Sequence, residues 1–350
     1  MSELRFAVCG AGFWSQVQLA AWQEIAGVRC VAICDLDRDK AGRLAEQFAI
    51  PGIYREVAEL LRHERLDFVD IISSPDSHAA LAAVASEHGI PVICQKPLAP
   101  TLVEAREMAA KFAERGIPLL VHENWRWQAP LRALKEVLDS GVIGRVFRAR
   151  IQYANSFPVF EKQPFLKESP RFILSDMGTH ILDTARFLFG EATSLVCQTC
   201  RVHPEIRGED VATVMMQMQN ATVVCELSYA SRVEHDRFPE TFVFVEADRG
   251  SVELAPDYWL RTTTGGQTTA RRVSPRHYAW ADPAFGLVHA SIVPCHANLA
   301  AALRGVQAAE TTAADNLKTL ELVEAAYESA ASGQAIAWAA PERSDPVETG

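Results

Sequence analysis

The sequence predicts two domains, an α/β domain with a doubly wound parallel sheet and an α+β domain built on a large open antiparallel sheet. Its 350 residues are more than one compact core usually needs. Up to residue 122, short apolar runs alternate with stretches of helical period, which is typical of a parallel sheet covered on both faces. From 193 to 262, strand-like stretches follow one another without helices, which is typical of an antiparallel sheet. We therefore expect a first domain at 1–122 and a second domain at 123–350.

The apolar runs of the first domain predict its strands, and the stretches between them predict its helices. The runs lie at residues 4–9, 29–34, 67–72, 91–94 and 117–121. Between them, 79–89 and 102–116 have the helical period, and Gly116 stands where a C-cap glycine ends a helix. In the second domain we expect a helix near 130–140, a strand at 145–155, a helix at 172–188, strands from 193 to 262, helices near 296–305 and 315–331, and a polar tail at 341–350.

Composition narrows the class of protein. Hydrophobic residues make up 49% and charged residues 22%, and the net charge of −10 argues against binding to nucleic acid or a membrane surface. The start of the chain reads as a strand rather than a signal peptide, and no run of eighteen apolar residues occurs. We expect a cytoplasmic protein with reduced cysteines. Cys197 and Cys200 form a C-x-x-C, but positions three apart on a strand point to opposite faces, so we expect no metal site.

The stretch "FAVCGAGFWSQVQLAAW" reads as a strand, a glycine turn and a helix. Gly10 permits a tight turn, Gly12 lets the backbone approach a pyrophosphate, and the third small position falls on Ser15. Asp35 ends the next strand, 25 residues after Gly10, where a carboxylate binds the adenine ribose and repels a 2′-phosphate. This favours NAD over NADP, although Arg38 could pair with such a phosphate. The alternative is a turn that binds no nucleotide, with Asp35 capping a helix.

The stretch "IISSPDSHAAL" ends another predicted strand. Ser74 suits an N-cap, Pro75 the first helical position and Asp76 the first turn, so helix capping alone explains all three. The loop also lies at the carboxyl end of a parallel strand, where it would face a cofactor. His78 is more often structural in such a place, and we keep it as a possible contact.

Lys96 and a polar helix stripe are the candidate chemical groups. Lys96 follows the strand at 91–94, at the sheet edge where open α/β sheets bind ligands, although such a lysine is usually only solvated. In "SDMGTHILDTARFLFG", Asp176, His180 and Asp183 share one helical stripe among apolar residues. The alternative is a core histidine paired with a carboxylate of its own helix.

These motifs, in this order, resemble the glucose–fructose oxidoreductase / inositol dehydrogenase / rhizopine-catabolism (Gfo/Idh/MocA) family. The resemblance covers residues 4–338 and rests on Gly10-x-Gly12 with Asp35, "SSPDSHA", "CQKP", "NWRWQAP", "SGVIG", "DMGTHILD" and "DNLKTLELVEAAYESAASGQAI". It implies a Rossmann domain, a second domain whose open sheet often forms the oligomer interface, and NAD(P)-dependent chemistry on sugars and cyclitols.

The resemblance also implies residue roles. The family lysine falls on Lys96, and its aspartate–histidine pair falls on Asp176 and His180. His180 would act as the base for a hydroxyl proton, Asp176 would orient its imidazole, and Lys96 would hydrogen-bond the reacting oxygen. The expected cofactor contacts are Gly10, Gly12, Phe13, Trp14, Asp35, Ser74, Pro75, His78, Gln95, Lys96 and Asn124, and the expected substrate contacts are Lys96, Asn124, Trp127, Asp176, Thr179 and His180.

Three features of the chain bear on these roles. The family's "EKP" is "QKP" here, so Gln95 removes a carboxylate beside the nicotinamide, and the glycines that often precede the family aspartate are missing from "RFILSD". In "HENWRWQAP", Asn124 is well placed to touch nicotinamide or substrate. Trp125 and Trp127 could line a sugar site or simply pack, and Arg126 could form an interdomain ion pair.

The resemblance implies an NAD-dependent dehydrogenase acting on a CH–OH group of a small sugar. The "QKP" and "HENWRWQ" variants are similar to aldose dehydrogenases for sugars such as D-apiose, which would oxidise C1 to a lactone. The alternatives are an NAD-assisted glycosidase of the same fold, a myo-inositol or cyclitol dehydrogenase, and a non-catalytic sensor. We expect a homodimer or homotetramer formed through the second sheet.

Overall fold

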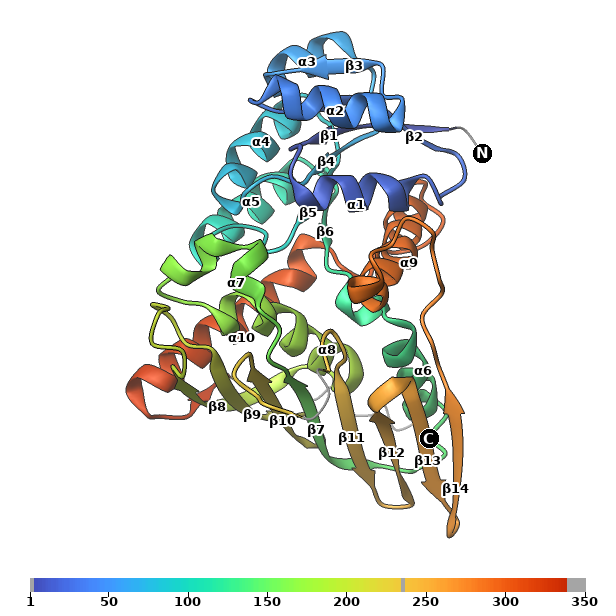
Figure 1. The fold of residues 1–350 in the computed structure, drawn as a ribbon, viewed down its shortest axis with the longest axis vertical. Helices are drawn as coiled ribbons and strands as arrows, with labels where there is room; N and C mark the ends of the chain where they lie inside the picture. Colours follow the sequence, from blue (N-terminus) through green and yellow to red (C-terminus); the bar gives the residue numbers. More distant parts are fainter. Residues whose placement is uncertain (1–2, 234–236, 339–350) are drawn as a thin grey trace, which may run out of the picture.

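The computed structural model of the protein describes residues 3–233 and 237–338, and its chain forms two sheets that follow one another along the long axis (Figure 1). The polar tail expected at 341–350 lies outside the described residues. The first sheet and its helices comprise β1 (Leu4–Cys9), α1 (Phe13–Trp22), β2 (Val28–Cys34), α2 (Arg38–Phe48), β3 (Gly52–Tyr54), α3 (Val57–His63), β4 (Phe68–Ile71), α4 (Pro75–Glu87), β5 (Val92–Gln95), α5 (Leu102–Glu114) and β6 (Leu119–His122).

The first sheet is parallel throughout, with the order β3-β2-β1-β4-β5-β6 within the described residues. Its order reverses between β1 and β4, so the loops that follow these strands open a crevice at the carboxyl edge. One face packs against α1 and α2 and the other against α3, α4 and α5. The predicted doubly wound sheet is confirmed. The edge strand β3 was not expected, because three half-buried residues make too short an apolar run.

The rest of the chain forms the second sheet and the helices between the two sheets. Its elements are η1 (Trp125–Trp127), α6 (Ala129–Asp139), β7 (Val146–Ala154), α7 (Val159–Lys162), η2 (Pro164–Glu168), η3 (Leu174–Gly178), α8 (Thr179–Phe189), β8 (Ala192–Cys200), β9 (Val211–Met218), β10 (Thr222–Ser228), β11 (Phe242–Ala247), β12 (Gly250–Ala255), η4 (Pro256–Tyr258), β13 (Trp259–Thr264), β14 (Gln267–Arg272), η5 (Pro283–Phe285), α9 (Gly286–Leu303), α10 (Ala313–Ser332) and β15 (Ile336–Ala337).

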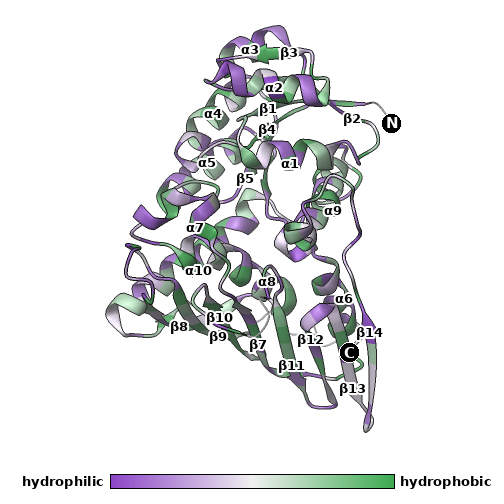
Figure 2. Ribbon diagram, in the orientation of Figure 1, coloured by the Kyte–Doolittle hydropathy of each residue, from purple (hydrophilic) through white to green (hydrophobic). Residues whose placement is uncertain are grey.

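The second sheet is large and mostly antiparallel, as predicted. Its order is β14-β13-β12-β11-β7-β10-β9-β8-β15 within the described residues, and β7 and β10 form a parallel pair that the sequence did not indicate. Buried and exposed residues alternate along strands such as β9, so hydrophobic and hydrophilic residues are interspersed (Figure 2). Cys197 of β8 is buried whereas Cys200 is exposed, which confirms that the two cysteine side chains of the C-x-x-C lie on opposite faces of the strand. The helices α6, α8 and α10 lie on the side that faces the first sheet (Figure 1).

The two closing helices return to the first sheet. Cys295 and Leu299 of α9 join the core under α1, and Leu320 of α10 joins the core under α5. We expected α9 to begin near 296, after Pro294, but its buried first turns extend it back to Gly286. By length and composition alone, Pro283–Leu303 could cross a membrane, yet 67% of that stretch's most apolar window is buried inside the protein. Its apolar character is therefore that of a core helix.

Candidate active site

The glycine turn after β1 leaves open space for a ligand. Gly10 has a φ of +113°, and a Cβ there would lie 2.4 Å from the carbonyl oxygen of Ile72, so only glycine fits. A Cβ at Gly12 would have nothing within 4 Å, and α1 begins there without a side-chain cap. Backbone N–H groups at this helix terminus are therefore available to an anion. Ser15 is fully buried, as close helix packing requires.

Asp35 ties the loop after β2 to the glycine turn. Its carboxylate accepts hydrogen bonds from the backbone N–H of Ala11 at 2.7 Å and of Asp37 at 2.8 Å. Asp35 does not cap a helix, which was the alternative considered from the sequence, because Asp37 is the N-cap of α2. Next to the turn, Phe13 is 58% exposed and Trp14 is half-buried. The arrangement fits a bound dinucleotide.

The loops after β4 and β5 are joined by His78. This buried ring contacts the carbonyl oxygen of Pro97 at 3.1 Å through Nδ1 and that of Ser73 at 3.1 Å through Nε2. His78 thus holds two loops of the carboxyl edge together, which is the structural alternative noted for it. Ser74 and Pro75 begin α4 as the capping pattern predicts, although the Ser74 side chain makes no cap bond. Their contacts with a cofactor stay predictions.

Lys96 and Asp176 meet across the two domains. The Lys96 ammonium donates to Asp176 Oδ1 and to the Asp176 carbonyl oxygen, both at 3.1 Å. Gln95 Oε1 accepts the backbone N–H of Lys96 at 2.7 Å, so this side chain fixes the start of the lysine loop. The side chains of Lys96 and Asp176 are 17% and 23% exposed, which leaves both within reach of a small molecule.

His180 has a partner that the sequence analysis missed. Its Nδ1 lies 2.6 Å from Oε1 of Glu123, the residue that directly follows β6. The expected pairing of Asp176 with His180 is corrected: Lys96 holds Asp176, and Glu123 holds His180. The reason is local, because Asp176 lies in the π-helical turn η3, whose wider winding disturbs the regular helical stripe.

Burial dominates the electrostatics of the His180–Glu123 pair. Burial, and then the positive charge of Lys96, lower the pKa of His180 well below 6.5. Burial raises the pKa of Glu123 from 4.5 to about 7. The imidazole is therefore neutral at pH 7, with one ring nitrogen free of a proton.

The segment that carries Asp176 and His180 is anchored from outside. The Glu209 carboxylate accepts backbone N–H groups from Phe172 and Leu174 at 3.1 to 3.2 Å, and it accepts the Tyr327 hydroxyl at 2.6 Å. These bonds satisfy donors at the start of the segment, which otherwise lacks a cap. At the junction with α8, the Thr179 hydroxyl donates to the Asp176 carbonyl oxygen at 2.8 Å. Thr179 is buried, and its expected contact with substrate stays a prediction.

The turn after β6 packs between the domains. Asn124 donates its amide to Ser291 Oγ at 2.7 Å and to the Val288 carbonyl oxygen at 3.2 Å, so this group is directed at α9. Trp127 is buried beneath the guanidinium of Arg132, whose carbon lies 4.1 Å from the indole centroid. Contacts of Asn124 and Trp127 with substrate or cofactor stay predictions.

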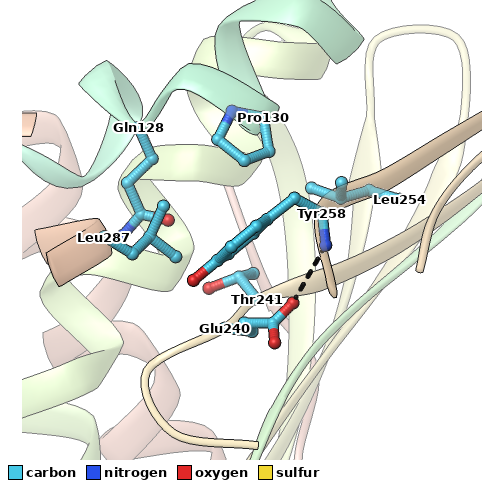
Figure 3. A pocket seen from close by; sticks show the side chains of 7 residues that line it. All are labelled: Gln128, Pro130, Glu240, Thr241, Leu254, Tyr258 and Leu287. Carbon is cyan, nitrogen blue, oxygen red and sulfur yellow. Dashed lines mark hydrogen bonds between the residues drawn. The ribbon is translucent and has the colours of Figure 1, made fainter. Parts of the chain in front are cut away.

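Arg126 and Trp125 each support α8. The Arg126 guanidinium donates to Asp183 at 2.8 Å and 2.5 Å, so the ion pair considered from the sequence joins the turn after β6 to α8 and does not cross the predicted domain boundary. The Trp125 ring stacks on His180, with centroids 4.6 Å apart and planes at 23°. Its indole N–H donates to Thr241 Oγ1 at 3.0 Å. Figure 3 shows the hollow beside Thr241, where the Tyr258 ring points towards Leu287; it has no room for a water molecule.

Comparison with known proteins places the chain in a family. Residues 4–123 match the oxidoreductase family with an NAD-binding Rossmann fold, and residues 131–253 match the GFO/IDH/MocA C-terminal domain. The chain belongs to the GFO/IDH/MocA oxidoreductase family. Both the resemblance and the enzyme class predicted from the sequence are confirmed.

Full-length relatives within the GFO/IDH/MocA family are similar to this chain. D-apiose dehydrogenase of Rhizobium rhizogenes is 40% identical over 96% of this chain and 98% of its own. D-apiose dehydrogenase of Paraburkholderia graminis is 41% identical over 100% of this chain and 93% of its own. An oxidoreductase from Agrobacterium radiobacter, solved with NAD⁺, L-tartaric acid and magnesium, has a TM-score of 0.94 at 40% identity and covers 96% of this chain and 98% of its own.

Proposed function

We propose that this protein is an NAD-dependent dehydrogenase that oxidises C1 of a small aldose, of the D-apiose kind, to its lactone. The observation that carries the proposal is the meeting of Lys96, Asp176 and His180 at the carboxyl edge of a nucleotide-binding sheet. Full-length relatives at 40% and 41% identity that are named D-apiose dehydrogenases support the substrate.

NAD would be held by the glycine turn and by Asp35. Gly12 offers free backbone and open space to the pyrophosphate, and the Asp35 carboxylate lies beside the turn to receive the ribose hydroxyls. A carboxylate there disfavours a 2′-phosphate, so NAD is preferred over NADP. When bound, NAD supplies the acceptor for the hydride that leaves the sugar carbon.

The chain's own residues would position the sugar and take its proton. Lys96 would donate a hydrogen bond to the reacting oxygen while Asp176 holds the ammonium in place. His180, neutral and buried, would accept the hydroxyl proton through the ring nitrogen that Glu123 does not occupy.

The free thiols of the described chain support a location in the reducing cytoplasm, which cell fractionation would test.

A panel of aldoses and cyclitols, offered with NAD and with NADP, tests the function by NADH absorbance. We expect turnover with a branched or small aldose and NAD, and a loss of about 100-fold or more in kcat for His180→Ala with NAD affinity retained. A sugar product without accumulation of NADH would favour the NAD-assisted glycosidase. Oxidation of cyclitols alone would favour a cyclitol dehydrogenase.

We also propose that the outer face of the second sheet joins copies of the chain. Strand register places Met215, Val224, Arg150 and Phe244 in one row across β9, β10, β7 and β11. Met215 and Phe244 are 48% and 43% exposed, and the helices α8 and α10 lie on the opposite side. A dimer or tetramer through this row would bury them. Light scattering should then report a mass at least twice the 38.5 kDa of one chain.

A further inference from the structure

We propose that Glu123 is a positioning residue for His180. Its carboxylate keeps the ring proton on Nδ1, so that Nε2 is the nitrogen that receives the proton of the substrate hydroxyl. The inference rests on the proposed dehydrogenase function, in which His180 is the base, and it gives Glu123 the orienting role that the sequence suggested for Asp176.

The Glu123 carboxylate is itself rigidly placed. Its Oε1 accepts the backbone N–H of Trp125 at 2.9 Å as well as contacting His180 Nδ1 at 2.6 Å. The Trp125 N–H and the positive charges of Lys96 and Arg126 oppose the rise that burial causes in the Glu123 pKa, and so favour the carboxylate. A carboxylate oxygen only accepts, so in that form Nδ1 carries the hydrogen of the 2.6 Å contact. Glu123 is fully buried, so water does not compete for this bond.

The imidazole has little freedom to choose another partner. The Trp125 indole covers one face of the imidazole ring. The indole N–H donates a hydrogen bond to Thr241 Oγ1, which fixes the indole in place. Asp176 instead pairs with Lys96, which binds its Oδ1 and its carbonyl oxygen, while Nδ1 contacts Glu123. The tautomer with hydrogen on Nδ1 therefore follows from the Glu123 contact and from the stacking that holds the ring in place.

Proton transfer gives this pair a catalytic consequence. When the sugar is oxidised, the hydroxyl O–H bond breaks and a new N–H bond forms at Nε2, which turns the imidazole into an imidazolium. A buried cation is costly unless an opposite charge adjoins it, and Glu123 supplies that charge without taking the proton. The Nδ1 hydrogen stays between the two residues throughout. Glu123 Oε2, buried without a hydrogen-bond partner in the described chain, needs no part in the transfer.

Other titratable groups face the pair from the surrounding elements. They are Lys96 after β5, His122 of β6, Arg126 of η1, Asp176 of η3, Asp183 of α8, Cys295 of α9 and Asp315 of α10. Within the described residues, none of these groups hydrogen-bonds the imidazole as Glu123 does at 2.6 Å, so replacing Glu123 isolates one interaction.

Kinetics of Glu123→Gln test the proposal on the full chain with NAD. Glutamine keeps the volume and both acceptor bonds but removes the charge, so we expect kcat to fall about 100-fold with little change in KM. The acid limb of the kcat/KM profile should move to lower pH, because an imidazolium without its carboxylate loses a proton more readily. A uniform fall with an unmoved limb would overturn the proposal. Asp70→Asn, which removes another fully buried carboxyl, is the matched control and should leave kcat unchanged.

A nuclear magnetic resonance measurement decides the case even if Glu123→Gln folds poorly or no sugar is oxidised. Ring ¹⁵N spectra of the wild-type protein, with His180→Gln for assignment, report which nitrogen of His180 carries hydrogen at neutral pH. Hydrogen on Nδ1 with a strongly deshielded proton supports the pair, and hydrogen on Nε2 overturns it. Failure of the sugar panel would remove the dehydrogenase function while leaving this result intact.

Discussion

Arg126→Met tests whether the ion pair between Arg126 and Asp183 stabilises the fold. Arg126 is 5% exposed and Asp183 is fully buried, and the guanidinium binds both carboxylate oxygens, at 2.8 Å and 2.5 Å. The same group reaches Asp315 at 3.0 Å and the Glu310 carbonyl oxygen at 3.3 Å. Methionine fills the space of the aliphatic stem but leaves the Asp183 carboxylate with weaker partners, the Thr319 hydroxyl at 3.2 Å and the Arg186 guanidinium at 3.8 Å.

The expected loss of stability follows from the cost of keeping the Asp183 carboxylate buried without its main partner. Removing one partner of a buried pair costs about 3–5 kcal/mol, so the free energy of unfolding should fall by that amount in urea titrations. The double variant Arg126→Met/Asp183→Asn should recover most of the loss, since it removes the charge as well. Arg132→Met, which breaks a half-exposed pair with Glu310, should cost at most about 1 kcal/mol. A single variant as stable as this control, or a double variant no better than the single one, would refute the reasoning.

Two further predictions concern pH and assembly. Burial raises the pKa of Asp70 from 3.8 to about 7, so between these values the folded chain keeps a proton that the unfolded chain has released, and the free energy of unfolding falls as pH rises. Asp70→Asn should flatten this fall between pH 5 and pH 8 by about 3 kcal/mol, measured by urea unfolding, and an unchanged slope would contradict the burial argument. Met215→Asp on the outer face of the second sheet should lower the mass in solution to 38.5 kDa, whereas Val103→Asp, 63% exposed on α5, should not; a mass that stays high in Met215→Asp argues for another interface.

Much of the fold could be predicted because strands that are buried on both faces of a sheet consist of continuous apolar residues. Strands β4, β5 and β6 are continuous buried runs, and their apolar residues stand out between helical stretches. The parallel pairing of β7 with β10 could not be predicted, because the alternation of buried and exposed residues is the same in either direction. The packing of α9 against the first domain could not be predicted either, because the sequence of an apolar helix does not indicate which surface the helix packs on.

The candidate site was predicted in part for the same kind of reason. The sequence indicated Lys96 because this residue directly follows a strand at the carboxyl edge of the sheet. Glu123 follows the neighbouring strand in the same way, since Gln95 and His122 are register partners, and this signal could have revealed it. The partner of His180 could not be inferred from helical spacing, because the π-helical turn at Asp176 changes the register on which that inference depends.

The paired charges explain why the site lies where the two domains meet. The first sheet contributes Lys96 and Glu123 from the ends of adjacent strands, and one continuous helical segment contributes Asp176 and His180. Each pair therefore joins the edge of the first sheet to the helical segment, and neither pair forms unless that segment sits correctly against the sheet. Arg126 lies three residues after Glu123 and binds Asp183, three residues after His180, so this ion pair fixes the same two segments. Its loss should consequently weaken catalysis as well as stability, with kcat falling more than NAD affinity, because NAD would be bound chiefly by the glycine turn and Asp35, which this ion pair does not contact.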